Sequence, residues 1–97
     1  MTIFQLECYY ALAQSLNFTQ TASQQYITQP ALSRSISSLE KELGITIFNR
    51  SGRGVTLTND GTEFLLYARQ VYAQYKELLE KYGKASNLKK KFGVSTQ

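Results

Sequence analysis

The sequence predicts a mainly helical fold with three helices, one short β-hairpin and a long final helix. Apolar residues recur at three- and four-residue steps in three segments, which is the spacing of one helical face. In one glycine-containing segment the period changes to two, as in paired strands. A chain of 97 residues with 42% hydrophobic content allows one compact core but no second domain of ordinary size.

The first two helices precede a tight turn. Apolar residues on one face predict a helix over Ile3–Leu16, and Thr2 and Gln5 stand in the spacing of a capping box. A short second helix is expected over Gln20–Tyr26, with Thr19 as its N-cap.

The third helix begins only a few residues later. Thr28 can cap it, Pro30 is tolerated within its first turn, and Gly44 suits the left-handed conformation that ends a helix. Two helices joined by so short a turn are typical of a helix-turn-helix. The buried stripe of the third helix is expected to comprise Ala31, Leu32, Ile36, Leu39 and Leu43.

A β-hairpin is predicted where Ile47–Arg50 and Val55–Thr58 flank a turn at 51–54 that holds two glycines. Together with the three helices it completes a winged helix-turn-helix over residues 1–58. Two arginines, Arg50 and Arg53, stand at the base and at the tip of this wing.

A long helix is expected over residues 59–83, capped by Thr58 or Asn59, and residues 84–97 read as a basic tail or linker. The long helix repeats apolar residues at alternating steps of four and three, a heptad-like seam with no partner in so small a domain. The seam therefore predicts a two-fold dimer. Its residues are Phe64, Ala68, Val71, Tyr75, Leu78 and Tyr82.

Composition narrows the classes of function. The chain holds 11 Lys and Arg against 7 Asp and Glu, a formal charge of +4 that favours a polyanionic partner. With no histidine and one cysteine, Cys8, we expect no disulfide, no metal, no cofactor and no catalytic group that would make it an enzyme. No segment resembles a signal peptide or membrane span, so we expect no membrane partner and a cytoplasmic, nucleoid-associated protein.

Several motifs occur together at a characteristic spacing. The run from Gln29 to Ser33, Gln-Pro-Ala-Leu-Ser, is followed by Leu39, Glu40, Leu43 and Gly44, then by Phe48 and Arg50. Up to about residue 85 the sequence closely resembles the LysR-type transcriptional regulators. The resemblance implies a bacterial regulator whose long helix pairs with that of a second subunit, forming a homodimer, or a tetramer in a full-length form. Full-length members of that family continue into a two-lobed domain that binds a small-molecule effector. No effector site is expected within this chain, which is either the DNA-binding part of such a protein or a natural short form.

The third helix supplies the candidate DNA contacts. A recognition helix places its N-terminal residues against base edges in the major groove. Glutamine can pair with adenine, arginine can fork onto guanine, and proline can pack on a thymine methyl. Short hydroxyl side chains let a helix lie close to phosphates. The candidates on this helix are Thr28, Gln29, Pro30, Ser33, Arg34 and Ser37.

The wing arginines are the other candidates. Arg53, between two glycines at the tip, is expected to reach a narrow minor groove, where negative potential is concentrated. Arg50 has two interpretations: a DNA contact, or an ion pair with Glu40 or Glu42.

We therefore expect sequence-specific binding of double-stranded DNA by a dimer that reads an inverted-repeat operator. The alternative is a helical protein-interaction module that uses the seam of the long helix, with the basic charge serving solubility.

Overall fold

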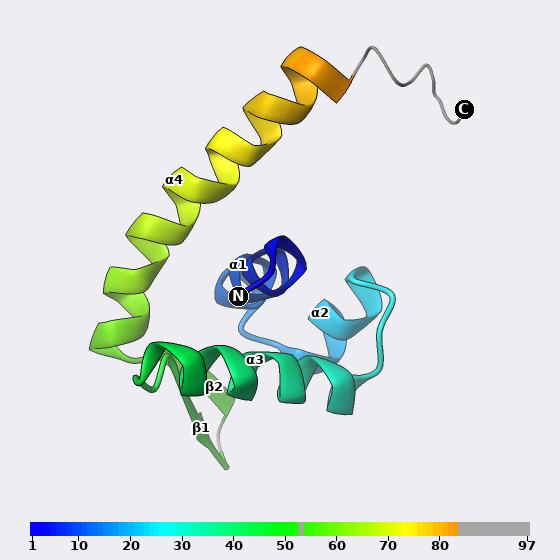
Figure 1. Ribbon diagram of the computed structural model, residues 1–97. Helices are drawn as coiled ribbons and strands as arrows, with labels where there is room; N and C mark the ends of the chain where they lie inside the picture. Colours follow the sequence, from blue (N-terminus) through cyan, green and yellow to red (C-terminus); the bar gives the residue numbers. More distant parts are fainter. Residues whose placement is uncertain (53, 84–97) are drawn as a thin grey trace.

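The computed structural model describes residues 1–52 and 54–83. Arg53 and the expected basic tail at 84–97 lie outside the described residues. The elements follow the predicted mainly helical order, a winged helix-turn-helix and then a long helix that extends away from it (Figure 1). They are α1 (Ile3–Ser15), α2 (Phe18–Gln24), α3 (Gln29–Leu43), β1 (Phe48–Ser51), β2 (Gly54–Leu57) and α4 (Asn59–Tyr82).

Side-chain caps set the bounds of the first two helices. At α1 the predicted capping box is confirmed, because the Thr2 hydroxyl accepts from the Gln5 N–H and the Gln5 side chain accepts from the Thr2 N–H. At α2 the predicted cap is wrong. The Asn17 side chain, not Thr19, takes this position and accepts from the Gln20 N–H at 2.9 Å. An asparagine side chain at the cap accepts from a free N–H of the first turn. The helix α2 therefore begins at Phe18, two residues before the predicted start at Gln20.

Both predicted ends of α3 are confirmed. The Thr28 hydroxyl accepts from the Ala31 N–H at 3.2 Å, and Gly44 ends the helix with φ +72°. Three α3 side chains, those of Leu32, Ile36 and Leu39, are 0% exposed. One side of α3 is therefore part of the core.

The wing is a two-stranded antiparallel hairpin in which Phe48 pairs with Leu57 and Ser51 with Gly54. It follows α3 after a short loop. The carboxylate of Glu40 on α3 accepts from the N–H groups of Ile47 and Phe48, at 2.8 and 3.2 Å. This contact fixes the base of the wing against α3.

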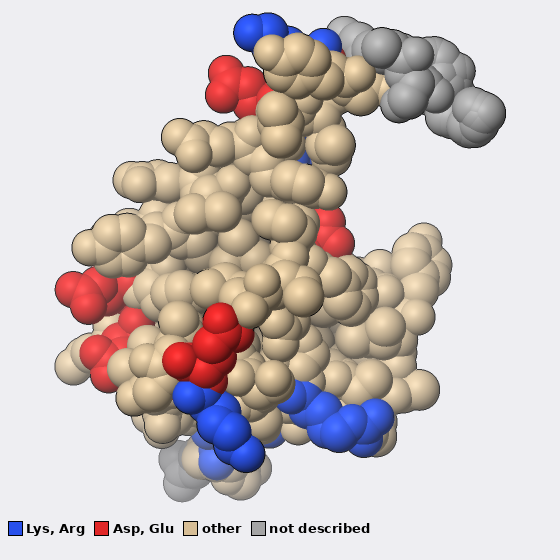
Figure 2. All heavy atoms as spheres, in the orientation of Figure 1, with Lys and Arg blue, Asp and Glu red and all other residues tan. Residues whose placement is uncertain are grey.

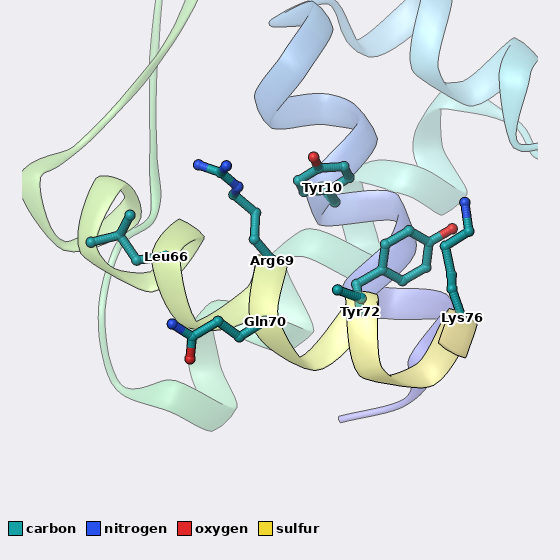
Figure 3. A pocket seen from close by; sticks show the side chains of 7 residues that line it. Tyr10, Leu66, Arg69, Gln70, Tyr72 and Lys76 are labelled. Carbon is teal, nitrogen blue, oxygen red and sulfur yellow. The ribbon is translucent and has the colours of Figure 1, made fainter. Parts of the chain in front are cut away.

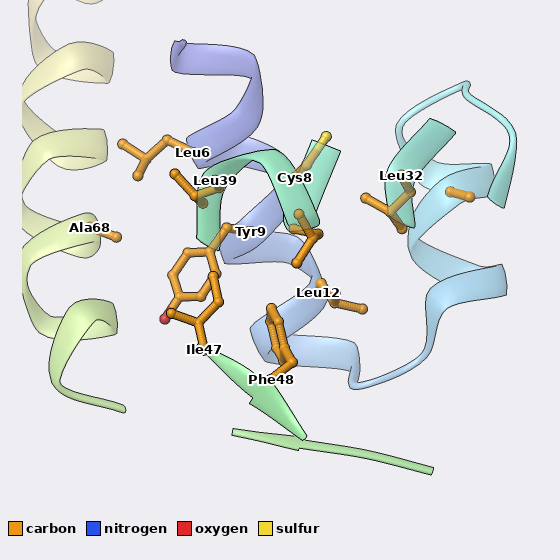
Figure 4. Packing of buried hydrophobic residues seen from close by; sticks show 11 residues of the cluster. Leu6, Cys8, Tyr9, Leu12, Leu32, Leu39, Ile47, Phe48 and Ala68 are labelled. Carbon is orange, nitrogen blue, oxygen red and sulfur yellow. The ribbon is translucent and has the colours of Figure 1, made fainter. Parts of the chain in front are cut away.

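The core lies between α1, α3, the wing and the first turns of α4 (Figure 4). Tyr9 of α1 is 0% exposed and its ring packs against those of Phe48 and Phe64, with centroids 5.6 and 4.9 Å away. Two tyrosine hydroxyls bond within this chain: Tyr9 donates to the Gly61 carbonyl at 2.7 Å, and Tyr72 donates to Glu7 at 3.0 Å.

The structure divides the predicted seam of α4 into two parts. Ala68 is 1% exposed, so it packs within its own domain and leaves almost no surface for a second chain. Phe64 is partly buried against the same core, and its place in a dimer contact stays a prediction. Val71, Leu78 and Tyr82 are exposed, at 48%, 53% and 61%. None of the described helices is long and apolar enough to cross a membrane.

Candidate nucleic-acid interface

The outward face of α3 has no packing role. A shallow hollow runs along it, and the core residues of the helix lie on the opposite side. Polar and basic residues predominate along it: three serines, one arginine and one lysine contribute to its lining. Its lining residues are Pro30, Ser33, Arg34, Ser37, Ser38 and Lys41.

Both acids of α3 are held away from this face. Glu40 caps the start of β1, as described above, and the Glu42 carboxylate lies 2.7 Å from the Met1 ammonium. In Figure 2, Lys and Arg side chains gather along the lower edge of the molecule, over α3 and the wing, and the visible acidic side chains lie above them. The face therefore presents positive charge with no opposing carboxylate of α3.

Gln29 is the first residue of α3, and a residue of α2 forms a hydrogen bond with its side-chain amide. The Thr19 hydroxyl donates to the Gln29 Oε1 at 3.2 Å, and both residues are exposed. The start of α2 thus helps to orient the Gln29 side chain.

Arg50 connects the wing to α3. Its Nη1 donates to the Ser33 Oγ at 2.8 Å, and its guanidinium lies 4.6 Å from the centroid of the Phe18 ring. The alternative that Arg50 pairs with Glu40 or Glu42 is wrong, because β1 and the N-terminus already occupy these carboxylates. A cation over an aromatic face is favourable, and here it directs the guanidinium toward α3.

The structure thus brings most of the predicted contact residues onto one surface. Pro30, Ser33, Arg34 and Ser37 share the hollow, and Arg50 reaches it from the wing. Thr28 does not line the hollow, and its hydroxyl is engaged as the helix cap.

Sequence reasoning missed two residues of this surface. Lys41 lies seven positions after Arg34, two helical turns along the same face, so the helical period could have identified it. Thr19 had been taken for a cap, and no local pattern places its hydroxyl beside Gln29.

A second hollow, of about 660 Å³, lies between α1 and α4 (Figure 3). Tyr10 of α1 and Tyr72 of α4 line it, with ring centroids 5.7 Å apart. The Lys76 ammonium lies 5.7 Å from the centroid of the Tyr72 ring. This hollow is built from the aromatic contacts that hold α4 against α1, away from the basic face of α3.

Four of the exposed apolar side chains of α4 lie on one face of the helix and form a stripe. Tyr67 joins Val71, Leu78 and Tyr82 on a single face, at steps of four, seven and four, and is 63% exposed. Tyr67 was not among the predicted seam residues. It takes the place on the exposed face that Ala68 was expected to fill.

Comparison with known proteins gives the family. Residues 3–62 match the family model described as bacterial regulatory helix-turn-helix protein, lysR family. Over 93 residues the chain is 38% identical to the probable RuBisCO transcriptional regulator of Thalassiosira pseudonana, an alignment that covers 91% of this chain and 30% of that protein. The chain spans about a quarter to a third of the length of the curated relatives it matches.

Solved structures agree with this assignment. Full-length OxyR C199D from Pseudomonas aeruginosa has a TM-score of 0.82 and 34% identity, covering 90% of this chain and 30% of that one. The BenM_DBD/catB site 1 DNA complex has a TM-score of 0.81 and 32% identity, covering 88% of this chain and 96% of that one. The chain belongs to the LysR family of bacterial regulatory helix-turn-helix proteins, and the relatives that it matches are transcriptional regulators and not enzymes.

Proposed function

We propose that this chain binds double-stranded DNA sequence-specifically, as the DNA-binding part of a LysR-type transcriptional regulator acting at the bacterial nucleoid. The observation that carries the proposal is the outward face of α3, which is polar, basic and free of any role in the core. A helix of this kind fits the major groove. The similar BenM_DBD chain was solved in a complex with DNA.

Each residue of this face has a role in the proposal. Gln29, Ser33 and Arg34 meet base edges near the start of the helix, and Pro30 offers an apolar edge to a thymine methyl. Ser37 and Lys41, further along the same face, meet phosphates and fix the position of the helix in the groove. The N–H groups at the start of α3, beside Thr28, add a phosphate contact.

The wing extends this contact beyond the major groove. The guanidinium of Arg50 lies next to α3 at the base of the hairpin. Arg53, which lies outside the described residues, is assigned the neighbouring minor groove in this proposal because negative potential is concentrated there.

Dimerisation through α4 completes the site. The exposed stripe of Tyr67, Val71, Leu78 and Tyr82 is apolar enough to require a partner in water, and a second copy offers the same stripe. Two recognition helices related by a two-fold axis then read an inverted repeat. A tetramer is proposed only for a full-length form.

Selection from a pool of random duplexes tests the proposal. The whole chain is expected to enrich an inverted repeat at physiological salt. The Arg34→Ala and Gln29→Ala variants are expected to lose that enrichment or change its sequence, whereas Lys76→Ala on α4 is expected to behave like the parent. If the parent enriches no sequence, or both α3 variants enrich the parent's sequence, reading through α3 is excluded.

A further inference from the structure

Two of the proposed reading residues are held by partners outside α3. The carbonyl oxygen of Gln29 accepts from Thr19 of α2, and the hydroxyl oxygen of Ser33 accepts from Arg50 of β1. Each contact uses one lone pair of an acceptor oxygen on an outward-facing side chain and leaves the N–H or O–H donor of that side chain free. We propose that Thr19 and Arg50 are positioning residues that make Gln29 and Ser33 hydrogen-bond donors toward DNA, so that α3 favours guanine where these two side chains meet the bases.

The donor groups are the atoms left without a partner. A glutamine amide has one acceptor oxygen and two N–H donors, and a serine hydroxyl has one donor and two lone pairs. Within the described residues, the Gln29 NH₂ group and the Ser33 hydroxyl hydrogen make no hydrogen bond. Gln29 and Ser33 are one turn apart on α3, so both donors lie on the same side of the helix.

This arrangement changes the expected base. In the major groove guanine presents two acceptors, N7 and O6, whereas adenine presents one acceptor and one donor, and cytosine presents a donor. Pairing with adenine needs the Gln29 oxygen turned toward the base, but Thr19 turns it toward α2. Guanine accepts from both outward donors and therefore fits better than adenine.

Arg50 suits a positioning role better than a role as a simple phosphate contact. Its guanidinium is fixed at two points, by the Ser33 hydroxyl and by the face of the Phe18 ring. An arginine that served only as a positive charge would need neither contact. A lysine at this place would keep the charge but would lack the several N–H donors and the planar surface of the guanidinium.

The positioning role rests on the proposed DNA binding, and the test distinguishes failure of the positioning role from failure of DNA binding. The whole chain is first bound to duplexes that carry each of the four base pairs at every operator position. Guanine is expected at one position or more that loses its preference in Gln29→Ala or Ser33→Ala. Replacing that guanine by 7-deazaguanine, which lacks the N7 acceptor, is expected to weaken binding about fivefold, the effect of one hydrogen bond.

The positioning residues are then varied without removing the reading residues. Thr19→Val keeps the shape but removes the hydroxyl, and is expected to reduce the preference for guanine over adenine about fivefold. Thr19→Ser should restore it, and Thr62→Val on α4 serves as the matched control. Arg50→Lys is expected to reduce the preference for guanine as Ser33→Ala does. The double variant Ser33→Ala with Arg50→Lys should reduce it little further, because both changes break the same contact.

Three outcomes overturn the inference. Adenine at the positions read by Gln29 and Ser33 contradicts the donor arrangement. Parental base preference in both Thr19→Val and Arg50→Lys shows that neither residue positions a reader, although DNA binding through α3 then stands. If the parent binds no duplex at all, the proposed function fails and the inference fails with it.

Discussion

At the scale of single residues, Gly61 is required by a close approach between two elements. It lies in the first turn of α4, and a Cβ built on it would be 2.1 Å from the carbonyl oxygen of Ile47. Because the obstacle is backbone, no side-chain rotation can relieve it. Gly61→Ala is therefore expected to destabilise the fold by roughly 3 kcal/mol or more.

Urea denaturation checks this prediction. Gly52→Ala in the wing turn is the matched control, since no described residue beyond its chain neighbours lies within 4 Å of the added Cβ. The control is expected to stay within about 0.5 kcal/mol of the parent. Equal stability of the two variants would show that α4 does not approach Ile47 as closely as the structure has it.

Tyr9 couples stability to alkaline pH. Burial raises the pKa of this phenol from 10.0 to about 12. Because the folded pKa lies above the unfolded one, the stability that the neutral phenol contributes is fully present below about pH 10 and is lost as the pH rises toward 12. Tyr9→Phe should also lose about 1 kcal/mol at neutral pH, since its hydrogen bond to Gly61 disappears.

The measurement is the free energy of unfolding in urea at pH 9 and at pH 11. The fall between the two should be smaller for Tyr9→Phe than for the parent. Tyr67→Phe, at a site 63% exposed, should fall as the parent does. Identical falls for all three proteins would contradict burial of the Tyr9 hydroxyl.

At the scale of helices and strands, the sequence was informative where the signal was local. The caps of α3 at Thr28 and Gly44 follow from residue type. The threonine hydroxyl accepts from a free backbone N–H at the start of the helix, and glycine adopts a left-handed conformation at its end without strain. The start of α2 was missed because Asn17 and Thr19 are both good caps, and only packing decides between them.

Contacts between elements could not be predicted from the sequence. Glu40 was one of two candidate partners of Arg50, but its carboxylate meets two backbone N–H groups of the wing. A periodic pattern shows which residues share a face, and it does not show which face meets which neighbour. For the same reason Ala68 appeared in the seam of α4, although it lies in the core of its own chain.

The exposed stripe of α4 leads to a prediction about assembly. Leu78 is 53% exposed and lies in the half of the stripe that is farther from the core. In a two-fold dimer the same substitution occurs in both subunits, so two charges would be buried in the interface. Leu78→Glu is therefore expected to weaken dimerisation at least tenfold, about 1.4 kcal/mol or more. Sedimentation over a range of concentrations measures this change.

Leu66 provides the matched control for Leu78. It is 57% exposed on the same helix but on a different side, next to Arg69 and Gln70. Leu66→Glu should dimerise as the parent does. Equal weakening by both substitutions would mean that the partner covers more of α4 than the stripe, and no effect of Leu78→Glu would remove the stripe from the interface.

At the scale of the whole molecule, the distribution of charge matters more than its sum. A net charge of +4 is modest, but the acids of α3 are engaged at the wing and at the N-terminus, so the basic side chains beside them act without compensation. A dimer that neutralises about six phosphates should show a slope near −5 when the logarithm of the DNA association constant is plotted against the logarithm of salt concentration.

The variant Lys41→Ala tests which contacts determine that salt dependence. It lies in the α3 hollow beyond the base-reading residues, so each subunit should lose one phosphate contact in Lys41→Ala, and the slope should rise to about −3. Lys76→Ala removes the same charge from α4, where the ammonium lies over the Tyr72 ring, and should keep the parental slope. Fluorescence anisotropy on the selected duplex from 50 to 200 mM salt, roughly the range over which such contacts matter, measures both. Equal slopes for the two variants would mean that net charge, and not the placement of Lys41 on α3, determines the contact with DNA.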